Sequence, residues 1–192
     1  MNIAICGLGA IGSRVALELA RIAQPDYVLI DDDRVDAKNI ANQAYLLRHV
    51  RFHKIAAMAH MISEISPSSR VAMIEKRLTS LNARKFLSDA DLIVECFDNA
   101  ESKMAVSMCS LVEMIPCLHV GMNVGYGGIK WDNGNYTISD DDNAPDICTS
   151  DLNPGMAQFV AAATVSVIAN YLQNNIATNL SIAISNFHVI AS

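Results

Sequence analysis

Gly7-Leu8-Gly9-Ala10-Ile11-Gly12 is the stretch of this sequence that decides the fold. It follows a short apolar run over residues 2–6, which is typical of a buried strand. Apolar residues then recur at helical spacing over 11–23, and a second apolar run over 27–30 ends at Asp31. Two strands joined by one helix predict a βαβ unit, and such a unit requires parallel strands.

The three glycines and Asp31 have separate physical tasks in such a unit. One glycine permits the tight turn after the strand, one lets the backbone approach a phosphate, and one lets the helix pack closely on the sheet. The helix then points unpaired N–H groups at the phosphate, while Asp31 is placed to bond ribose hydroxyls. The sequence therefore predicts a nucleotide site at this loop.

The rest of the chain continues the alternation of strands and helices. We expect helices over 51–65, 81–87, 102–113 and 154–172, and strands over 70–74, 91–96, 117–120 and 181–190. A looser region over 125–128 is expected to lead to a hairpin turn at Asp132-Asn133-Gly134-Asn135. This order predicts an α/β fold in a single domain over 1–192: a Rossmann-like, doubly wound and mostly parallel sheet with a late hairpin or crossover insertion.

Composition narrows the class of protein and its partners. Of 192 residues, 52% are hydrophobic and 18% are charged, which favours a well-packed fold over disorder. The formal net charge of −6 and the lack of a lysine and arginine stripe argue against nucleic acid as the main partner. The apolar run over 156–172 falls short of the roughly 20 mainly apolar residues of a membrane span, so we expect a buried helix and no membrane partner.

The cysteines indicate a compartment rather than a metal site. Five cysteines stand in the sequence and no two form a Cys-x-x-Cys pair, so we expect no structural zinc. Cys6, Cys96 and Cys117 lie within apolar runs, where a free thiol behaves as a small core residue. This usage is typical of a reducing compartment and predicts a cytoplasmic protein.

The segment that follows the second strand narrows the function. Asp31-Asp32-Asp33-Arg34-Val35 is followed by Asn39-Ile40-Ala41-Asn42-Gln43. Lys54 then comes after a basic spacer, and Asp98-Asn99 comes just past the apolar run that ends at residue 96. Over about residues 2–130, and more loosely beyond, the sequence resembles the ThiF/MoeB/HesA superfamily of E1-like adenylating enzymes, whose pattern is Asp-x-Asp-x-Val, a gap, then Asn-x-x-Arg-Gln.

The resemblance implies an ATP-dependent adenylyltransferase that uses Mg²⁺. Its partner would be a small ubiquitin-like or sulfur-carrier protein, or a peptide with a free C-terminus, and the chain would form a homodimer or pair with a homologue. The resemblance assigns catalysis to Lys54 and Asp98 and the metal to Asp98. It assigns nucleotide binding to Gly7, Gly9, Ala10, Gly12, Asp31, Asp33, Asn39, Asn42, Gln43, Lys54, Asp98 and Asn99.

The chemistry of adenylation gives these assignments a physical reason. A carboxylate that attacks the α-phosphate of ATP meets a highly charged group, so a lysine and a metal ion must neutralise the charge that grows on the departing pyrophosphate. Asp98 follows a predicted strand, at the edge where open α/β sheets bind their ligands. The alternatives are a solvated surface position for Lys54 and a simple helix cap for Asp98-Asn99.

Two positions depart from the family pattern. Asn42 stands where the family has an arginine, and Lys103 stands where a second arginine is expected. An amide cannot replace the charge of an arginine fork, whereas a lysine keeps it as a point charge. Arg14, Arg34 and Arg48 are candidates to compensate.

Two other functions stay open at this point. Asn42 and the short length are compatible with a catalytically weakened member that binds a nucleotide or a partner without turning over. The glycine loop and Asp31 equally allow an NAD(P)-dependent oxidoreductase, but that reading leaves residues 33–43 unexplained.

Cys148 differs from the other cysteines in its surroundings. It lies in a polar, proline-punctuated stretch over 140–154, which is typical of a surface loop. Some members of the superfamily carry a transfer cysteine in the corresponding segment, so the resemblance makes Cys148 a candidate catalytic thiol that accepts the acyl group as a thioester. The alternative is an incidental loop cysteine.

Overall fold

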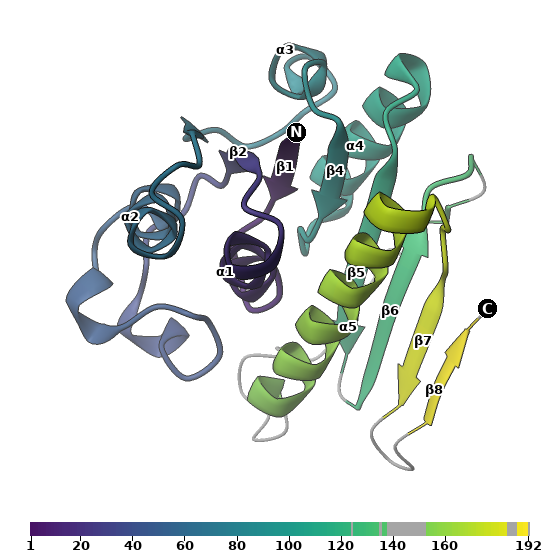
Figure 1. Ribbon diagram of the computed structural model, residues 1–192. Coiled ribbons are helices and arrows are strands. Elements are labelled where there is room, and N and C mark those ends of the chain that lie inside the picture. The colour runs from purple at the N-terminus through teal and green to yellow at the C-terminus, as the bar shows by residue number, and fades with distance from the viewer. Residues whose placement is uncertain (124, 135, 138–152, 184–187, 192) are drawn as a thin grey trace.

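The computed structural model describes residues 1–123, 125–134, 136–137, 153–183 and 188–191 (Figure 1). Its centre is an eight-stranded sheet in the order β3-β2-β1-β4-β5-β6-β7-β8. The strands are β1 Asn2–Cys6, β2 Asp26–Ile30, β3 Val71–Ile74, β4 Leu92–Glu95, β5 Cys117–Asn123, β6 Tyr126–Trp131, β7 Leu180–Ala183 and β8 His188–Ala191. The α-helices are α1 Gly12–Ile22, α2 Lys54–Ile65, α3 Ala83–Leu87, α4 Ala100–Glu113 and α5 Asn153–Asn174, and short 3-10 turns occur at Ala37–Asn39 and Leu47–His49.

The strands β3, β2, β1, β4 and β5 are parallel, as the βαβ pattern predicts. β1 pairs with β2 on one side and with β4 on the other, so the direction of winding reverses between β1 and β4. Open α/β sheets bind ligands at this switch point, beyond the carboxyl ends of the strands. The predicted doubly wound, mostly parallel α/β fold is confirmed.

The last three strands are antiparallel and correct the sequence prediction. The region over 125–128 is not loose: the chain turns at Gly125 (φ +74) and returns along β5 as β6. Glycine in β6 has a packing role, since a Cβ on Gly127 would lie 2.3 Å from Cγ2 of Val160 in α5. The described part of the predicted turn, Asp132 to Gly134, follows β6.

The predicted last strand over 181–190 is also corrected. It is two strands, β7 and β8, which pair antiparallel with Leu180 opposite Ala191. A single apolar stretch in the sequence does not reveal such a reversal, because both strands have the same β-branched and apolar composition.

Helices cover both faces of the sheet. α1, α2 and α5 lie on one face and α3 and α4 on the other (Figure 1). α5 is long and apolar enough to cross a membrane by length and composition alone. The expectation that this run falls short of a membrane span is therefore corrected. In this fold α5 packs on α1, β5 and β6 and buries Met156, Val160 and Ile168, which agrees with the predicted buried helix.

Candidate functional site

The three glycines of the loop between β1 and α1 differ in the space around them. Gly7 has φ +87, and a Cβ there would lie 3.0 Å from the backbone of Cys96. A Cβ on Gly12 would lie 1.9 Å from the carbonyl oxygen of Gly7. In contrast, a Cβ on Gly9 would meet nothing within 4 Å. Gly7 and Gly12 therefore permit close packing, while Gly9 leaves open space beside the backbone.

Asp31 ties the end of β2 to the glycine loop. Its Oδ2 accepts the N–H of Leu8 at 2.7 Å and its Oδ1 accepts the N–H of Asp33 at 2.8 Å. Burial raises the pKa of Asp31 and outweighs the opposing effects of Lys54 and of the two N–H donors. A buried carboxylate with a raised pKa at a strand end is a feature of functional sites.

Lys54 is the first residue of α2 and is not on the solvated surface. Its side chain is 7% exposed, and its Nζ lies 2.7 Å from Oδ2 of Asp33 and 3.9 Å from Oδ1 of Asp31. The side chain of Asp33 is 68% exposed, so the ion pair lies at an open edge. The structure therefore brings a nearly buried ammonium to the mouth of the glycine loop.

The segment after β2 folds back over this loop. The hydroxyl of Tyr45 donates to the carbonyl oxygen of Leu8 at 3.0 Å. Oδ1 of Asn39 accepts the N–H of Asp36 at 3.0 Å, which holds a 3-10 turn in place. Gln43 is nine-tenths buried, and its Oε1 has no hydrogen-bond partner in the described part of the chain. A buried polar atom without a protein partner indicates a place for a ligand or water.

Arg14 lies beside Asn42, the residue that replaces an arginine of the family pattern. Its Nη1 donates to the carbonyl oxygens of Ala10, at 2.7 Å, and of Asn42. Its Nε donates to Oε1 of Gln158 in α5 at 3.1 Å. Of the three candidate replacements, Arg14 is therefore the one whose guanidinium contacts the glycine loop, whereas Arg34 donates to the carbonyl of Arg51.

Asp98 lies in the turn between β4 and α4, across the switch point from the glycine loop. The two turns are adjacent, because the Cβ position of Gly7 contacts Cys96 and Phe97. Asp98 is exposed and has no hydrogen-bond partner among the residues that the structure describes. Asn99 is the N-cap of α4 and accepts the N–H of Ser102 at 2.9 Å. The capping role thus belongs to Asn99, which leaves Asp98 available.

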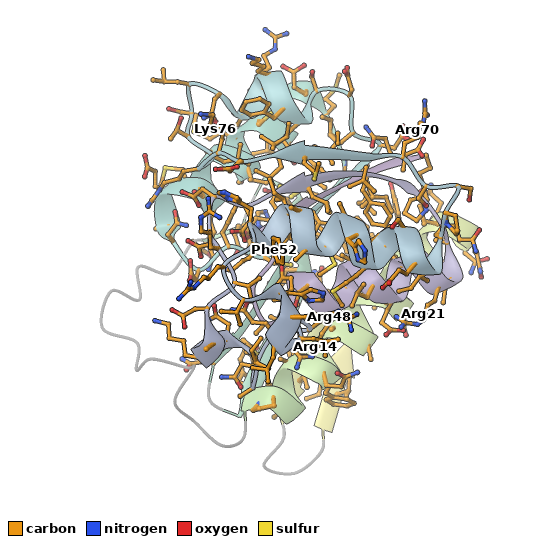
Figure 2. The ribbon with its side chains drawn as sticks, turned by 90° about the vertical axis from the view of Figure 1, so that its left-hand side faces the viewer. Arg14, Arg21, Arg48, Phe52, Arg70 and Lys76 are labelled. Carbon is orange, nitrogen blue, oxygen red and sulfur yellow. The ribbon has the colours of Figure 1, made fainter. Side chains whose placement is uncertain are left out.

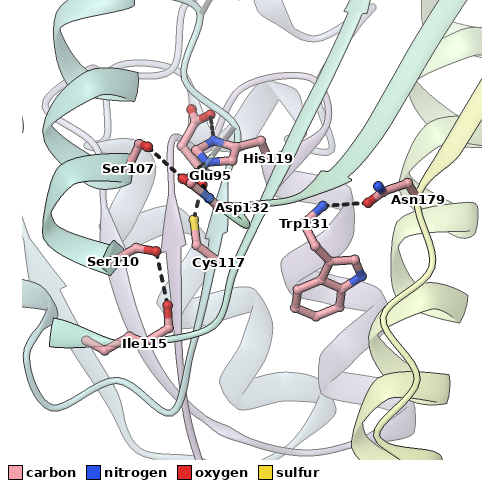
Figure 3. A network of polar contacts seen from close by, with 10 residues as sticks. Glu95, Ser107, Ser110, Ile115, Cys117, His119, Trp131, Asp132 and Asn179 are labelled. Carbon is pink, nitrogen blue, oxygen red and sulfur yellow. Dashed lines mark hydrogen bonds and ion pairs between the residues drawn. The ribbon is translucent and has the colours of Figure 1, made fainter. Parts of the chain in front are cut away.

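A second polar cluster, which sequence reasoning missed, lies under this turn (Figure 3). His119 of β5 has Nδ1 3.0 Å from Oε2 of Glu95 and Nε2 2.9 Å from Oδ2 of Asp132, and all three side chains are almost fully buried. Ser107 donates to Oδ2 of Asp132 at 2.6 Å, and the ring of Tyr136 stacks on His119 with centroids 3.6 Å apart.

The buried cluster touches the turn that carries Asp98. Oε1 of Glu95 accepts the N–H of Phe97 at 2.5 Å, while its other oxygen faces His119. The available signal was that Glu95 and His119 interrupt two apolar strands, where a charged or polar side chain needs a partner. Glu95, which His119 holds in place, therefore fixes the backbone next to Asp98.

The described cysteines are core residues. Cys6, Cys96, Cys109 and Cys117 are free thiols, and burial raises the pKa of each. None of these four is poised as a thiolate. Cys148 lies outside the described residues.

The fold and this edge first define a class: doubly wound α/β proteins with a glycine-rich loop after β1, an acidic residue ending β2 and polar groups at the β1–β4 switch point. The sequence profile of the ThiF family matches residues 1–186, and the chain belongs to the ThiF family.

Relatives of known name share modest identity. The sulfur carrier protein ThiS adenylyltransferase of Escherichia coli (strain K12) is 25% identical over 142 residues, which are 70% of this chain and 56% of that protein. The tRNA threonylcarbamoyladenosine dehydratase of the same strain is 30% identical over 129 residues, 66% of this chain and 47% of that protein. Ubiquitin-like modifier-activating enzyme 5 of Drosophila virilis is 30% identical over 117 residues, which are 55% of this chain and 29% of that protein. The chain thus spans less than two thirds of each relative.

Solved structures support the fold. The structure of Escherichia coli MccB with AMPCPP and MccA has a TM-score of 0.85 at 15% identity. The match covers 100% of this chain and 63% of the MccB chain. PaaA has a TM-score of 0.77 at 17% identity, with coverages of 100% and 63%. The Escherichia coli tRNA N6-threonylcarbamoyladenosine dehydratase in complex with AMP has a TM-score of 0.62 at 26% identity, with coverages of 67% and 56%.

Proposed function

We propose that this chain is an ATP-dependent adenylyltransferase that activates the C-terminal carboxylate of a small protein or peptide. The observation that carries the proposal is Lys54, a nearly buried ammonium that is ion-paired to Asp33 and lies 3.9 Å from Asp31, the carboxylate that accepts the N–H of Leu8 in the glycine loop. A buried lysine at a helix start is costly unless its charge is used or paired. A triphosphate offers the charge that this lysine would neutralise.

Three groups at the edge have capacity that a nucleotide would fill. The space beside Gly9 is open, and it lies just before the start of α1, where a helix offers N–H groups that can bind an anion. The amide of Gln43 has a buried atom without a protein partner, and either end of the amide suits a ribose hydroxyl or a phosphate oxygen. Asp31, held at the end of β2 by two backbone N–H groups, would accept ribose hydroxyls with its remaining lone pairs.

The donor set also suits Mg²⁺. Carboxylate oxygens, phosphate oxygens and water are the ligands that Mg²⁺ prefers, and Asp98 is an exposed carboxylate at the switch point. Mg²⁺ held there would offset negative charge on the phosphates. The carboxylates of Asp31, Asp32 and Asp33 also lie within 4.8 Å of one another, but Lys54 already pairs with Asp33 and approaches Asp31. Asp98 is therefore the stronger candidate.

The reaction follows from these positions. An oxygen of the partner's terminal carboxylate attacks the α-phosphorus, the bond to the bridging oxygen breaks, and pyrophosphate leaves with the electron pair. The product is a mixed anhydride between the carboxylate and AMP. Lys54 and the N–H groups of the glycine loop stabilise negative charge as it moves onto pyrophosphate. Arg14 holds the loop in shape by bonding Ala10 and Asn42.

Relatives support this class of substrate. The ThiS adenylyltransferase acts on a sulfur carrier protein, and MccB has been solved with ATP and with the peptide MccA. The second candidate is a member that binds nucleotide without adenylating, which the asparagine at position 42 favours. Arg14 favours the enzyme instead, because its guanidinium lies beside Asn42 and donates to the carbonyl oxygen of that residue.

ATP–pyrophosphate exchange with the partner protein tests the proposal. Lys54→Ala and Asp98→Ala should each lower the exchange rate by about 100-fold or more, because each acts on charge that develops in the transition state. Asp89→Ala is the matched control, since Asp89 precedes β4 whereas Asp98 follows it. Exchange at the wild-type rate in both site variants would overturn the assignments, and no exchange in the wild type with an established partner would favour the binding subunit.

A further inference from the structure

The arginines of this chain fall into two groups. Four of the eight pair with carboxylates: Arg21 with Glu18, Arg70 with Asp26, Arg77 with Glu101 and Arg84 with Glu113. Arg14 bonds carbonyl oxygens at the glycine loop. The remaining three, Arg34, Arg48 and Arg51, have no carboxylate partner within the described ranges, and all three lie between β2 and α2. This is unexpected in a chain of net charge −6.

Large apolar side chains are interleaved with these arginines. Leu47 is 74% exposed and Phe52 is 58% exposed. We call Arg34, Leu47, Arg48, Arg51 and Phe52 the arginine–apolar surface. Figure 2 shows Arg48 and Phe52 on the face of the molecule that also carries Arg14. Exposed apolar groups bordered by unpaired charges are typical of interaction sites.

The surface is held in place by the backbone. The N–H of Val35 donates to the carbonyl of Phe52 at 2.9 Å, and the N–H of Arg51 donates to the carbonyl of Val35 at 2.9 Å. Nη1 of Arg34 donates to the carbonyl of Arg51 at 2.8 Å. The backbone of Arg51 has φ +75, a conformation that residues other than glycine rarely adopt. The apolar groups are therefore presented outward by an ordered segment.

The surface adjoins the candidate phosphate site. Phe52 is two residues before Lys54, and the N–H of Lys54 donates to the carbonyl of Asp33 at 3.0 Å. A protein whose terminal carboxylate reaches this edge must dock its body close by.

We propose that the arginine–apolar surface docks an acidic protein partner through carboxylates on Arg34, Arg48 and Arg51 and apolar side chains on Leu47 and Phe52. The inference rests on the proposed function, because it names the docking face of the protein to be activated. Charge complementarity selects this partner: opposite charges across an interface steer association and fix register.

Two other occupants fit less well. A two-fold contact between copies of this chain would bring the same arginines face to face, which like-charge repulsion opposes. Single-stranded nucleic acid is bound by aromatic platforms along a basic groove, whereas this surface offers one aromatic ring and an aliphatic leucine.

Binding of a synthetic probe tests the surface without knowledge of the natural partner. The probe is a fluorescent peptide of alternating glutamate and leucine with a free C-terminus, and its Kd is measured by anisotropy. Arg51→Glu and Phe52→Ser should each raise the Kd by about tenfold or more, and a glutamate and serine peptide should bind the wild type less tightly by a similar factor. Arg77→Glu, which removes an arginine that is paired with Glu101 of α4, should leave the Kd unchanged.

Several outcomes would overturn the inference. These are no peptide binding, equal binding by the loop variants, or oligouridylate binding that is lost in the same variants. Self-association of the wild type that Phe52→Ser abolishes would assign the surface to a second copy. Stronger peptide binding after Asp140, Asp141 and Asp142 are changed to serine would assign it to the chain's own acidic stretch. The ATP-dependent thermal shift, which Arg51→Glu should retain, separates failure of docking from failure of the proposed function.

Discussion

Two polar clusters of this protein each combine one basic side chain with two carboxylates, but they differ in how many of their polar atoms have a protein partner. At the open edge, Lys54 stands with Asp33 and Asp31; under the β4–α4 turn, His119 stands between Glu95 and Asp132. The buried cluster is complete, since both nitrogens of His119 and both oxygens of Glu95 have protein partners. The open edge has an exposed Asp33, a free space beside Gly9 and an unpartnered Gln43 atom. A polar cluster whose atoms all have protein partners is typical of a structural role, whereas polar atoms without protein partners are typical of a binding site.

The pKa shifts point the same way. Burial raises the pKa of Asp31, so the charged form costs stability at neutral pH. For Asp132 burial acts in the same direction, but hydrogen bonds from Ser107 and His119 outweigh it and lower the pKa. Functional groups are often held at such a cost, whereas structural groups contribute stability.

The largest expected effect is on folding. His119→Leu leaves Glu95 and Asp132 buried without their shared partner, so we expect a loss of about 3–5 kcal/mol in the free energy of unfolding. Urea denaturation measures it. Glu18→Gln, which breaks the exposed pair with Arg21, is the control and should cost less than about 1 kcal/mol. Equal small losses in both variants would show that the buried cluster is not the structural one.

Two alanine substitutions in one loop should separate folding from binding. Gly12→Ala places a Cβ 1.9 Å from a backbone oxygen and should destabilise the fold by about 1–3 kcal/mol. Gly9→Ala meets no atom within 4 Å and should change stability by less than about 0.5 kcal/mol, yet weaken ATP binding by filling the space for a phosphate. Calorimetric unfolding and ATP titration test both. Full ATP affinity in Gly9→Ala would remove Gly9 from the site.

Acid titration should distinguish the two aspartates. The pKa of Asp132 in the fold is below its ordinary value of 3.8, so its stabilisation is present above 3.8 and is lost as pH falls further. The difference in Tm between wild type and Asp132→Asn should therefore close under strong acid. For Asp31 the raised pKa has the opposite sign: stability is present below 3.8 and is lost as pH rises through the raised pKa, so the Tm of the wild type relative to that of Asp31→Ala should rise on acidification. Parallel curves for the two variants would contradict the comparison.

The smallest effect concerns Asn99, the N-cap of α4 next to Asp98. Asn99→Ala removes the cap of α4 and should cost about 1 kcal/mol, while Asn99→Ser retains a capping oxygen and should recover most of it. Thermal unfolding measures both. If Asn99→Ser is as stable as the wild type but no longer binds ATP, Asn99 belongs to the nucleotide site at the open edge.

Local patterns predicted much of the fold and the edge. The β1–α1–β2 unit, the glycine loop and Asp31 follow from periodicity and spacing within a short stretch, and they lie as expected. Lys54 and Asp98 follow from a resemblance, and the structure brings both to the carboxyl ends of the strands.

The features that the sequence did not predict depend on contacts between segments that are far apart in the chain. The sequence does not predict β6 because its glycines are typical of a loop, whereas in the structure Gly127 leaves the space that Val160 of α5 occupies. The pairing of Glu95 with His119 depends on the register of β4 against β5. The hydrogen bond from Arg14 to the carbonyl oxygen of Asn42 depends on how the segment after β2 folds back over the glycine loop. None of these is encoded in spacing along the chain.

Thermal unfolding with added nucleotides tests the central claim most directly. If the open edge is an ATP site, ATP with Mg²⁺ at about 100 times its Kd should add about 2.7 kcal/mol and raise the Tm of the wild type. The same addition should leave Lys54→Ala almost unshifted, and NAD or NADP should have no effect. A shift with NAD or NADP alone, and none with ATP and Mg²⁺, would contradict the account and assign the glycine loop to a nicotinamide cofactor.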